Sequence, residues 1–247
     1  MNLIIDVGNS FVKLAVFELD RILDKKIMNA ENFLENFKKF IEKHETIAKG
    51  IMSSVGNLTQ ADLLCIKKSC DMLVLNQDTP VPFSNLYATP KSLGIDRIAL
   101  VCAAVHHYKN KNVLIIDAGT CITYDFVTSE AEYFGGGISP GLYLRYKALN
   151  NYTAKLPLLS PEVPKGVVGD STKASIHSGV VFGILNEIEG NVLRYQDKYE
   201  DLTIILTGGD SEFLSKQLKS TIFVNSNFLL EGLNSILQYN LSGQLKN

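Results

Sequence analysis

The sequence has little that would place the protein in a membrane or on a nucleic acid. None of its 247 residues lie in a stretch that approaches 18 uncharged apolar positions, so we expect no membrane span. Lysine and arginine total 24 against 26 aspartates and glutamates, and no long basic run occurs. A nucleic acid, which is bound largely through its charged phosphates, is therefore not an expected partner.

Export signals and zinc-type cysteine pairs are also missing. The first residues, Met1–Asp6, already contain a carboxylate and have neither a basic segment nor a long apolar segment, so no signal peptide is predicted. The four cysteines, at positions 65, 70, 102 and 121, do not have the tight paired spacing of a zinc site. Scattered free thiols are typical of a reducing compartment, and we expect a cytoplasmic protein.

Nearly the same octamer is present twice. LIIDVGNS occupies positions 3–10 and LIIDAGTC occupies 114–121, an offset of 111 residues. Each copy leads into alternating apolar residues, which predicts a strand, a glycine turn and a second strand. With 46% apolar residues the chain can bury two cores, so we expect an N-terminal half over 1–110 and a C-terminal half over 111–247.

Both halves are predicted to be α/β. After the hairpin at 2–20, the first half has the pattern of a strand at 21–30, a helix at 31–44, a strand at 48–55, a helix at 59–70, a strand at 71–76 and a helix at 96–109. The proline-rich segment 76–93 between the last two is typical of a functional loop or linker. The second half repeats the plan, with a hairpin at 112–130, strands at 131–140, 202–209 and 221–226, helices at 141–156, 210–219 and 227–240, and one long helix or two at 171–199.

The repeated hairpin suits phosphate binding. Gly8 and Gly119 have no Cβ, so backbone N–H groups in each turn can approach a phosphate oxygen closely. Asn9, Ser10 and Thr120 add polar donors beside the glycines. Two such hairpins could clamp a polyphosphate from both sides.

An aspartate precedes each turn. Asp6 and Asp117 would repel a phosphate directly, so their expected role is to hold a cation, or a water on that cation, which bridges to the phosphate oxygens. Either aspartate could instead only start a turn, but the equivalent placement of both favours binding. Lys13, on the second strand of the first hairpin, could approach the phosphates or equally face solvent.

A glycine pair follows a later strand. ILTGGD at 205–210 places two glycines between the strand and a helix whose first turn carries Asp210 and Glu212. Glycines allow a flat ring or a ribose to lie against the backbone, whereas the acidic residues would repel phosphate. This end therefore suits a nucleoside, although by itself it could be an ordinary turn.

These segments resemble the motifs of the type III pantothenate kinases, which belong to the acetate kinase, sugar kinase, Hsp70 and actin superfamily. DVGNS is similar to the first phosphate motif, with Ser10 in the place of a threonine. YATPKSLGIDR, positions 87–97, matches the pantothenate motif at each fixed position. DAGTCITYD resembles the second phosphate motif, with Cys121 where alanine is usual, and GGGISPGL resembles a segment near the subunit interface.

The resemblance implies both a fold and a reaction. The fold would be a duplicated ribonuclease-H-like (actin-like ATPase) α/β fold, with two similar halves, mixed sheets flanked by helices, and ATP between the halves. The reaction would be transfer of the γ-phosphoryl group of ATP to pantothenate, giving 4'-phosphopantothenate in the first step of coenzyme A biosynthesis. The family also implies a homodimer, magnesium with ATP, and a monovalent cation, potassium or ammonium.

Carried onto this sequence, the family motifs assign three sets of residues. The expected ATP-binding residues are Asp6, Val7, Gly8, Asn9, Ser10, Phe11, Val12, Lys13 and Thr120. The expected pantothenate-binding residues are Tyr87, Gly94, Ile95, Asp96, Arg97 and Thr172. Asp117 would hold the monovalent cation.

Each acceptor-site role has an alternative. Asp96 is the expected general base, because the acceptor hydroxyl must lose a proton, but it could instead cap the helix that begins beside it. Arg97 would bind the pantothenate carboxylate through its planar guanidinium, or form a surface salt bridge. Tyr87 would line the pocket, or only be partly buried. Thr172 would reach pantothenate from the partner subunit, or cap the long helix.

Two other functions compete with this prediction. The first is another small-molecule kinase of the same superfamily, acting on a sugar or acetate; the segment 87–97 argues against it. The second is a non-catalytic regulatory relative that keeps the fold. The presence of Asp6, Asp96, Arg97 and Asp117 argues against loss of catalysis.

Overall fold

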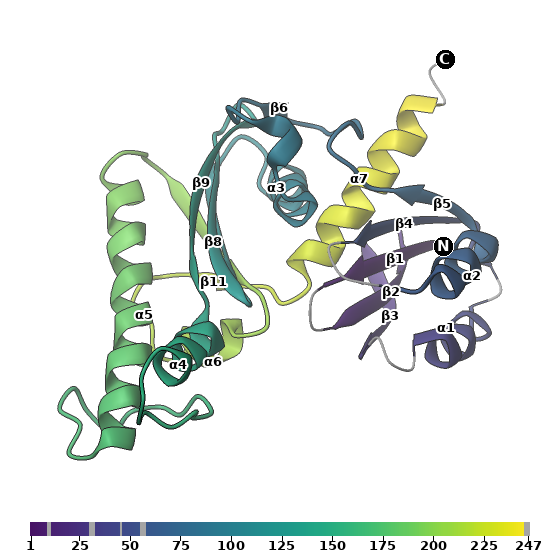
Figure 1. Cartoon of the computed structure of the whole chain (residues 1–247). Helices are drawn as coiled ribbons and strands as arrows, with labels where there is room; N and C mark the ends of the chain where they lie inside the picture. The colour runs from purple at the N-terminus through teal and green to yellow at the C-terminus, as the bar shows by residue number, and fades with distance from the viewer. Residues whose placement is uncertain (9–10, 30–32, 45, 55–57, 245–247) are drawn as a thin grey trace. The chain divides into compact units, whose positions relative to one another are not determined.

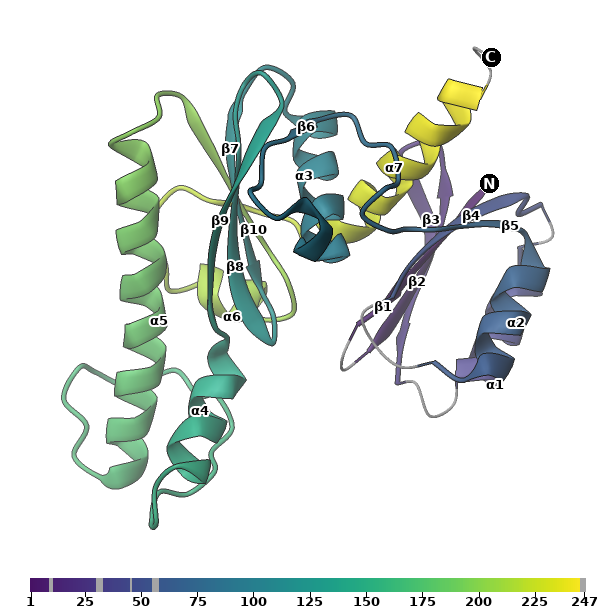
Figure 2. The ribbon, with the colours of Figure 1, turned by 45° about the horizontal axis from the view of Figure 1, so that its top comes forward.

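The structure is a computed structural model that describes residues 1–8, 11–29, 33–44, 46–54 and 58–244. Its internal contacts divide the chain into two compact units. The first unit comprises Met1–His107 together with Asn227–Asn247, and the second comprises Tyr108–Ser226. Figures 1 and 2 show the chain in two views, coloured by residue number from the N-terminus to the C-terminus.

The first unit is built on a mixed sheet of five strands. These are β1 (Asn2–Val7), β2 (Val12–Glu18), β3 (Arg21–Met28), β4 (Lys49–Ser54) and β5 (Asp71–Val74). They lie in the order β3-β2-β1-β4-β5. The two hairpin-connected pairs, β1 with β2 and β2 with β3, are antiparallel, whereas β4 is parallel to both β1 and β5. The central strand β1 therefore ends next to β2 on one side and β4 on the other.

Helices cover both faces of this sheet. Side chains alternate along a strand, so Leu3, Ile5 and Val7 of β1 share one face and pack with Phe33 and Phe37 of α1 (Phe33–Ile41). Helix α2 (Gln60–Ser69) lies on the same face, where its Ile66 joins that core cluster. The opposite face is covered by α3 (Ile95–His107) and α7 (Phe228–Gln244), as Figure 1 shows. Because both faces are covered, β1 is apolar at almost every position.

The second unit repeats the arrangement. Its strands are β7 (Asn112–Ala118), β8 (Cys121–Val127), β9 (Glu132–Pro140), β10 (Leu202–Thr207) and β11 (Phe223–Val224). They lie in the order β11-β10-β7-β8-β9, with antiparallel β7–β8 and β8–β9 pairs and parallel β7–β10 and β10–β11 pairs. Strand for strand, order and direction match the first unit. The predicted duplication is therefore present as a repeated order and direction of the five strands.

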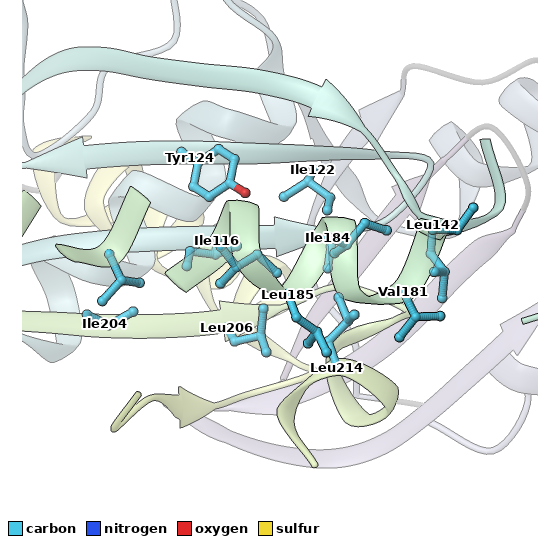
Figure 3. Packing of buried hydrophobic residues seen from close by; sticks show 14 of the residues in the cluster. Ile116, Ile122, Tyr124, Leu142, Val181, Ile184, Leu185, Ile204, Leu206 and Leu214 are labelled. Carbon is cyan, nitrogen blue, oxygen red and sulfur yellow. The ribbon is translucent and has the colours of Figure 1, made fainter. Parts of the chain in front are cut away.

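The core of the second unit lies between its sheet and its helices. The helices are α4 (Leu142–Asn151), α5 (Thr172–Gln196) and α6 (Ser211–Ser215). Figure 3 shows Val181, Ile184 and Leu185 of α5 packed against Ile116 and Leu206 of the central strands. This packing is why the segment predicted at 171–199 forms one long helix: its apolar residues recur at helical spacing along one sheet face.

The last helix, α7, groups with the first unit, whereas the sequence placed all of 111–247 in the second half. It packs on α3, where Gly232 allows close approach: a Cβ on that glycine would lie 1.9 Å from the Ala99 carbonyl oxygen. Asn234 accepts from the Asn2 side chain at 3.0 Å and donates to the Leu19 carbonyl at 2.8 Å. The helical pattern predicted α7 itself, but such a pattern does not say which sheet the helix covers.

The segment 76–93 carries little regular structure, as expected of a loop. It holds the two-residue strand β6 (Ser84–Asn85) and a single 3-10 turn at Pro90–Ser92 just before α3. Within the described parts of the chain, no helix is both long enough and apolar enough to cross a membrane.

Candidate active site

The first hairpin places a buried carboxylate at the end of β1. Strand register sets Asp6 opposite Lys13 on β2 and Ser53 on β4. The Ser53 hydroxyl donates to Asp6 Oδ1 at 2.9 Å, and Lys13 Nζ lies 3.7 Å from Asp6 Oδ2. Asp6 is only 5% exposed. Lys13 therefore points toward the Asp6 carboxylate while its side chain stays 29% exposed, and its approach to a phosphate stays a prediction. Ser53 was missed, because its strand pattern carried no sign that it would lie beside Asp6.

Burial dominates the electrostatics of Asp6. Burial raises the pKa of this carboxyl, Lys13 and Ser53 oppose that rise, and the neighbouring Asp96 carboxylate raises the pKa further. A buried carboxylate next to a second one favours a bound cation, since a cation relieves both desolvation and repulsion. Asp96 is far from Asp6 in the sequence, yet its carboxylate is near enough in the fold to influence the Asp6 pKa.

The turn that follows has the geometry expected of a tight hairpin. The Gly8 N–H donates to the Phe11 carbonyl at 3.0 Å, and a Cβ on Gly8 would lie 3.2 Å from that oxygen. Val7 and Val12 pair across the hairpin and are buried, so their side chains belong to the core, whereas Phe11 is exposed. Asn9 and Ser10 lie outside the described residues.

The acceptor motif leads into the first turn of α3. Asp96 Oδ1 accepts the N–H of Arg97 at 2.8 Å, so the carboxylate does help to satisfy the helix start. A Cβ on Gly94 would lie 2.4 Å from that same oxygen, so the glycine leaves room for the carboxylate. Ile95 is buried and anchors the turn in the core.

Arg97 is in the interior, which excludes a surface salt bridge as its role. Arg97 is 5% exposed, and its Cζ atom lies 5.7 Å from the centroid of the half-buried Tyr87 ring. A guanidinium over an aromatic face is held in one orientation. The structure thus brings together Tyr87, Asp96 and Arg97, as the sequence predicted for an acceptor site.

The second hairpin has a connection one residue shorter, because Ala118 pairs with Ile122 where Val7 pairs with Val12, and it has different neighbours. The Gly119 N–H donates to the Cys121 carbonyl at 2.9 Å, and Thr120 is exposed at the tip. Asp117 is half-buried at the end of β7, with Thr123 of β8 and Thr207 of β10 opposite it in register. Asp117 therefore has a threonine on each side, whereas Asp6 in the first hairpin has a lysine on one side and a serine on the other.

Two glycines that were not assigned to the site hold this hairpin. Gly208 has φ +93°, and a Cβ there would lie 2.3 Å from the Ala118 carbonyl oxygen and 2.4 Å from Asp117 Oδ1. Gly141 donates its N–H to the Thr120 carbonyl at 3.1 Å, and a Cβ on it would lie 2.1 Å from the Gly119 carbonyl oxygen. Only backbone without a side chain can come this close. The glycine pair in ILTGGD was the available signal for Gly208.

Thr172 begins α5 in the second unit. The helix is capped by Ser171, whose hydroxyl accepts the Ala174 N–H at 3.3 Å, so the capping role considered for Thr172 belongs to its neighbour. Thr172 is exposed and lines a groove of about 820 Å³ between α4 and α5. Most of the groove wall is apolar, from residues that include Leu149, Leu156, Ile176 and Val180.

Comparison with known proteins identifies the family. A family model described as type III pantothenate kinase matches residues 2–194. A type III pantothenate kinase from Christiangramia forsetii is 53% identical over 240 residues, which cover 97% of this chain and 99% of that protein. The chain belongs to the type III pantothenate kinase family. The prediction from the two phosphate motifs and the segment 87–97 is confirmed.

Solved structures support the fold. A protein from Campylobacter jejuni, described as a Baf family transcriptional activator, aligns with a TM-score of 0.61 at 23% identity, covering 97% of this chain and 99% of that one. An activator of 2-hydroxyisocaproyl-CoA dehydratase from Clostridium difficile, solved with bound ADPNP, aligns with a TM-score of 0.57 at 11% identity, covering 99% and 97%. With the repeated sheet topology, these likenesses confirm the duplicated ribonuclease-H-like fold for this pantothenate kinase family member.

Proposed function

We propose that the protein transfers the γ-phosphoryl group of ATP to the primary hydroxyl of pantothenate, giving 4'-phosphopantothenate, the first intermediate on the way to coenzyme A. The observation that carries this proposal is that a member of the type III pantothenate kinase family has both a buried hairpin aspartate, Asp6, and an acceptor motif with Asp96 and Arg97, whose guanidinium lies over the Tyr87 ring. The hairpin offers a charged phosphate site, and the motif offers a carboxylate that can accept a proton. A transferred phosphoryl group needs a charged phosphate site and a proton acceptor side by side.

The hairpin turns bind the phosphates of ATP in this mechanism. Backbone N–H groups around Gly8 and Gly119, with the Thr120 hydroxyl, donate to phosphate oxygens. Asp6 is suited to Mg²⁺, because a desolvated carboxylate beside a second one gains most from a divalent cation. Such a cation would supply neutralisation of the charge on the phosphates. Lys13, 3.7 Å from Asp6, adds positive charge to the same place.

The acceptor motif orients pantothenate and removes its proton. Arg97 donates to the pantothenate carboxylate, and the Tyr87 ring keeps the guanidinium in a fixed plane. Asp96 accepts the proton of the primary hydroxyl as that oxygen bonds to the γ-phosphorus. The bond from the γ-phosphorus to the bridging oxygen breaks, and ADP leaves with the electron pair.

The second hairpin would hold the monovalent cation. Asp117 fits a potassium or ammonium ion, because it is a half-buried carboxylate flanked in register by Thr123 and Thr207 and left open by the glycine at 208. Oxygen ligands of this kind suit hard cations. The ion would balance phosphate charge that the backbone N–H groups of the turn do not neutralise.

The acceptor site is completed by a second subunit. Thr172 belongs to the second unit and lines an apolar groove, whereas Tyr87, Asp96 and Arg97 belong to the first. In a two-fold dimer each subunit can donate the same residue to its partner's site. We propose that Thr172 and this groove bind the part of pantothenate that the partner's acceptor motif leaves exposed.

A phosphorylation assay with a panel of acceptors tests the function. Purified protein, Mg²⁺-ATP and potassium are combined with pantothenate, glucose, N-acetylmannosamine or acetate, and ADP release is measured with product mass. We expect turnover with pantothenate alone. Turnover with a sugar or acetate and not with pantothenate would favour another kinase of the superfamily. Tight ATP binding without turnover on any acceptor would favour a non-catalytic regulator.

A further inference from the structure

A half-buried ionic cluster lies in the second unit, and none of its residues was assigned to the site from the sequence; its Arg145 also lines the groove that contains Thr172. Its centre is Glu187 on α5, where Oε1 accepts from the Tyr124 hydroxyl at 2.9 Å and from the Ser139 hydroxyl at 2.5 Å. Glu187 Oε2 pairs with a terminal nitrogen of Arg145 on α4. The cluster thus joins two strands, β8 and β9, to two helices.

The charges in this cluster are fixed by their partners. Burial alone would raise the pKa of Glu187, but hydrogen bonds from Ser139, Arg145 and Tyr124 outweigh it and lower the pKa. Burial and the Glu187 carboxylate raise the pKa of the Tyr124 hydroxyl, which therefore stays a neutral donor. Apolar side chains of similar size could pack this place at little cost, so packing alone does not require an ion pair here.

Arg145 extends the cluster to the second hairpin. Its Nε donates to the Pro140 carbonyl at 2.9 Å, at the end of β9. The next residue, Gly141, donates to the Thr120 carbonyl at 3.1 Å, and its Cα packs so closely that a Cβ would lie 2.1 Å from the Gly119 carbonyl oxygen. A displacement of the Pro140–Gly141 peptide would therefore displace the Gly119–Thr120 turn.

We propose that Glu187 and Arg145 are positioning residues for the second phosphate hairpin. Glu187 holds the Arg145 guanidinium in place, and the guanidinium holds the Pro140 carbonyl. The next residue, Gly141, contacts the Gly119–Thr120 turn directly, so the position of the Pro140 carbonyl determines the position of the turn that binds ATP phosphate. This inference rests on the proposed function of the turn. This residue pair, neither member of which is assigned to ATP, thereby sets the affinity for ATP, since phosphate donors must be placed to within a fraction of an ångström.

Two substitutions separate this role from packing. Arg145→Lys keeps the charge opposite Glu187 but loses the planar guanidinium, whose separate nitrogens bond Glu187 and the Pro140 carbonyl in fixed directions. Glu187→Gln keeps the size but turns an amide NH₂ or a neutral oxygen toward the guanidinium. The matched control is Glu189→Gln on the same helix, where the carboxylate is also half-buried and accepts only from the Lys219 N–H, at 2.8 Å, among the bonds seen in the described residues.

The readouts are steady-state kinetics for each substrate and calorimetric binding of ADP with Mg²⁺. We expect Glu187→Gln and Arg145→Lys each to raise KM for ATP and Kd for ADP by roughly 10-fold, with KM for pantothenate unchanged. The double variant should be no worse than the more severe single one, because both act on one linkage. Tyr124→Phe, which removes one donor to Glu187, should give a smaller rise of about 2-fold and serves if the other variants fold poorly.

The possible results distinguish a failure of the positioning role of Glu187 and Arg145 from a failure of the proposed function. A lower Tm with unchanged ATP and ADP constants would show that the cluster is only structural and would overturn the inference. So would a rise confined to KM for pantothenate, because Arg145 also lines the groove that contains Thr172. If wild-type protein binds ADP but does not phosphorylate pantothenate, the proposed function fails; the ADP measurements still decide the inference.

Discussion

Gly208 offers a test of how closely the strand ends of the second unit are built around Asp117. It is the first glycine of ILTGGD, and its φ of +93° is a conformation that side-chain-bearing residues rarely adopt. In Gly208→Ala the new Cβ would lie 2.3 Å from the Ala118 carbonyl oxygen and 2.4 Å from Asp117 Oδ1. The backbone and the carboxylate would both have to move. Gly209→Ala is the matched control, because nothing lies within 4 Å of a Cβ at that position.

The cost of Gly208→Ala has two parts. The positive φ costs an alanine about 1–2 kcal/mol, and forcing a methyl group into an occupied place costs about 1–3 kcal/mol. The free energy of unfolding should fall by about 2–5 kcal/mol, the sum of the two ranges. For a chain of this size that lowers Tm by roughly 4–20 °C. Gly209→Ala should stay within about 0.5 kcal/mol of wild type, as surface substitutions usually do.

Thermal unfolding and ATP kinetics measure the two consequences separately. Besides the lower Tm, Gly208→Ala should raise KM for ATP and weaken activation by potassium, because the displaced carboxylate is the proposed cation ligand. If Gly208→Ala and Gly209→Ala have the same Tm and the same ATP constants, then the close packing of Gly208 on Asp117 does not exist in solution, and the geometry of the second hairpin must be revised.

Three further predictions concern the hairpins and the acceptor site. Asp6→Asn should abolish turnover yet raise Tm at neutral pH, because burial raises the folded pKa above its ordinary value of 3.8 and ionised Asp6 therefore destabilises the fold. This gain in Tm should shrink as pH falls through the raised pKa and disappear below the ordinary value, so a gain that persists in strong acid would contradict this. Asp117→Asn should remove the difference in rate between potassium and sodium buffers, whereas wild-type rates that are equal in both would refute the cation site. Asp96→Asn and Thr172→Arg should each be inactive, with a loss on the order of 10²-fold or more for the general base; mixed dimers should regain up to roughly a quarter of all sites, and a mixture that exchanges subunits but stays inactive would exclude a shared site.

Much of the fold was predictable because its signals are local. The alternation of apolar residues after LIIDVGNS and LIIDAGTC predicted both hairpins, and the structure shows them as β1–β2 and β7–β8. The repeat of the octamer predicted a duplicated architecture, which the matching strand orders confirm. A strand or helix is set largely by the spacing of apolar residues along it, so the order of elements can be predicted from one sequence.

The acceptor motif was equally visible. The eleven letters at 87–97 identified Tyr87, Asp96 and Arg97 before their positions were known, and the structure brings them together at the start of α3. The same letters could not say whether Arg97 would be buried. Arg97 is 5% exposed in the structure, and burial depends on how segments that are distant in the sequence pack together, which a local motif does not contain.

What the sequence by itself determined is the identity of the elements, the duplication and the motif residues. Only the tertiary structure decided which residues from distant strands meet at them: Ser53 and Lys13 at Asp6, Gly208 at Asp117, and the Glu187 cluster behind Gly141. It also decided that α7 groups with the first unit. The physical reason is that strand register and helix docking depend on the summed fit of many side chains across the sheet, whereas a motif or a period is written within a few neighbouring residues.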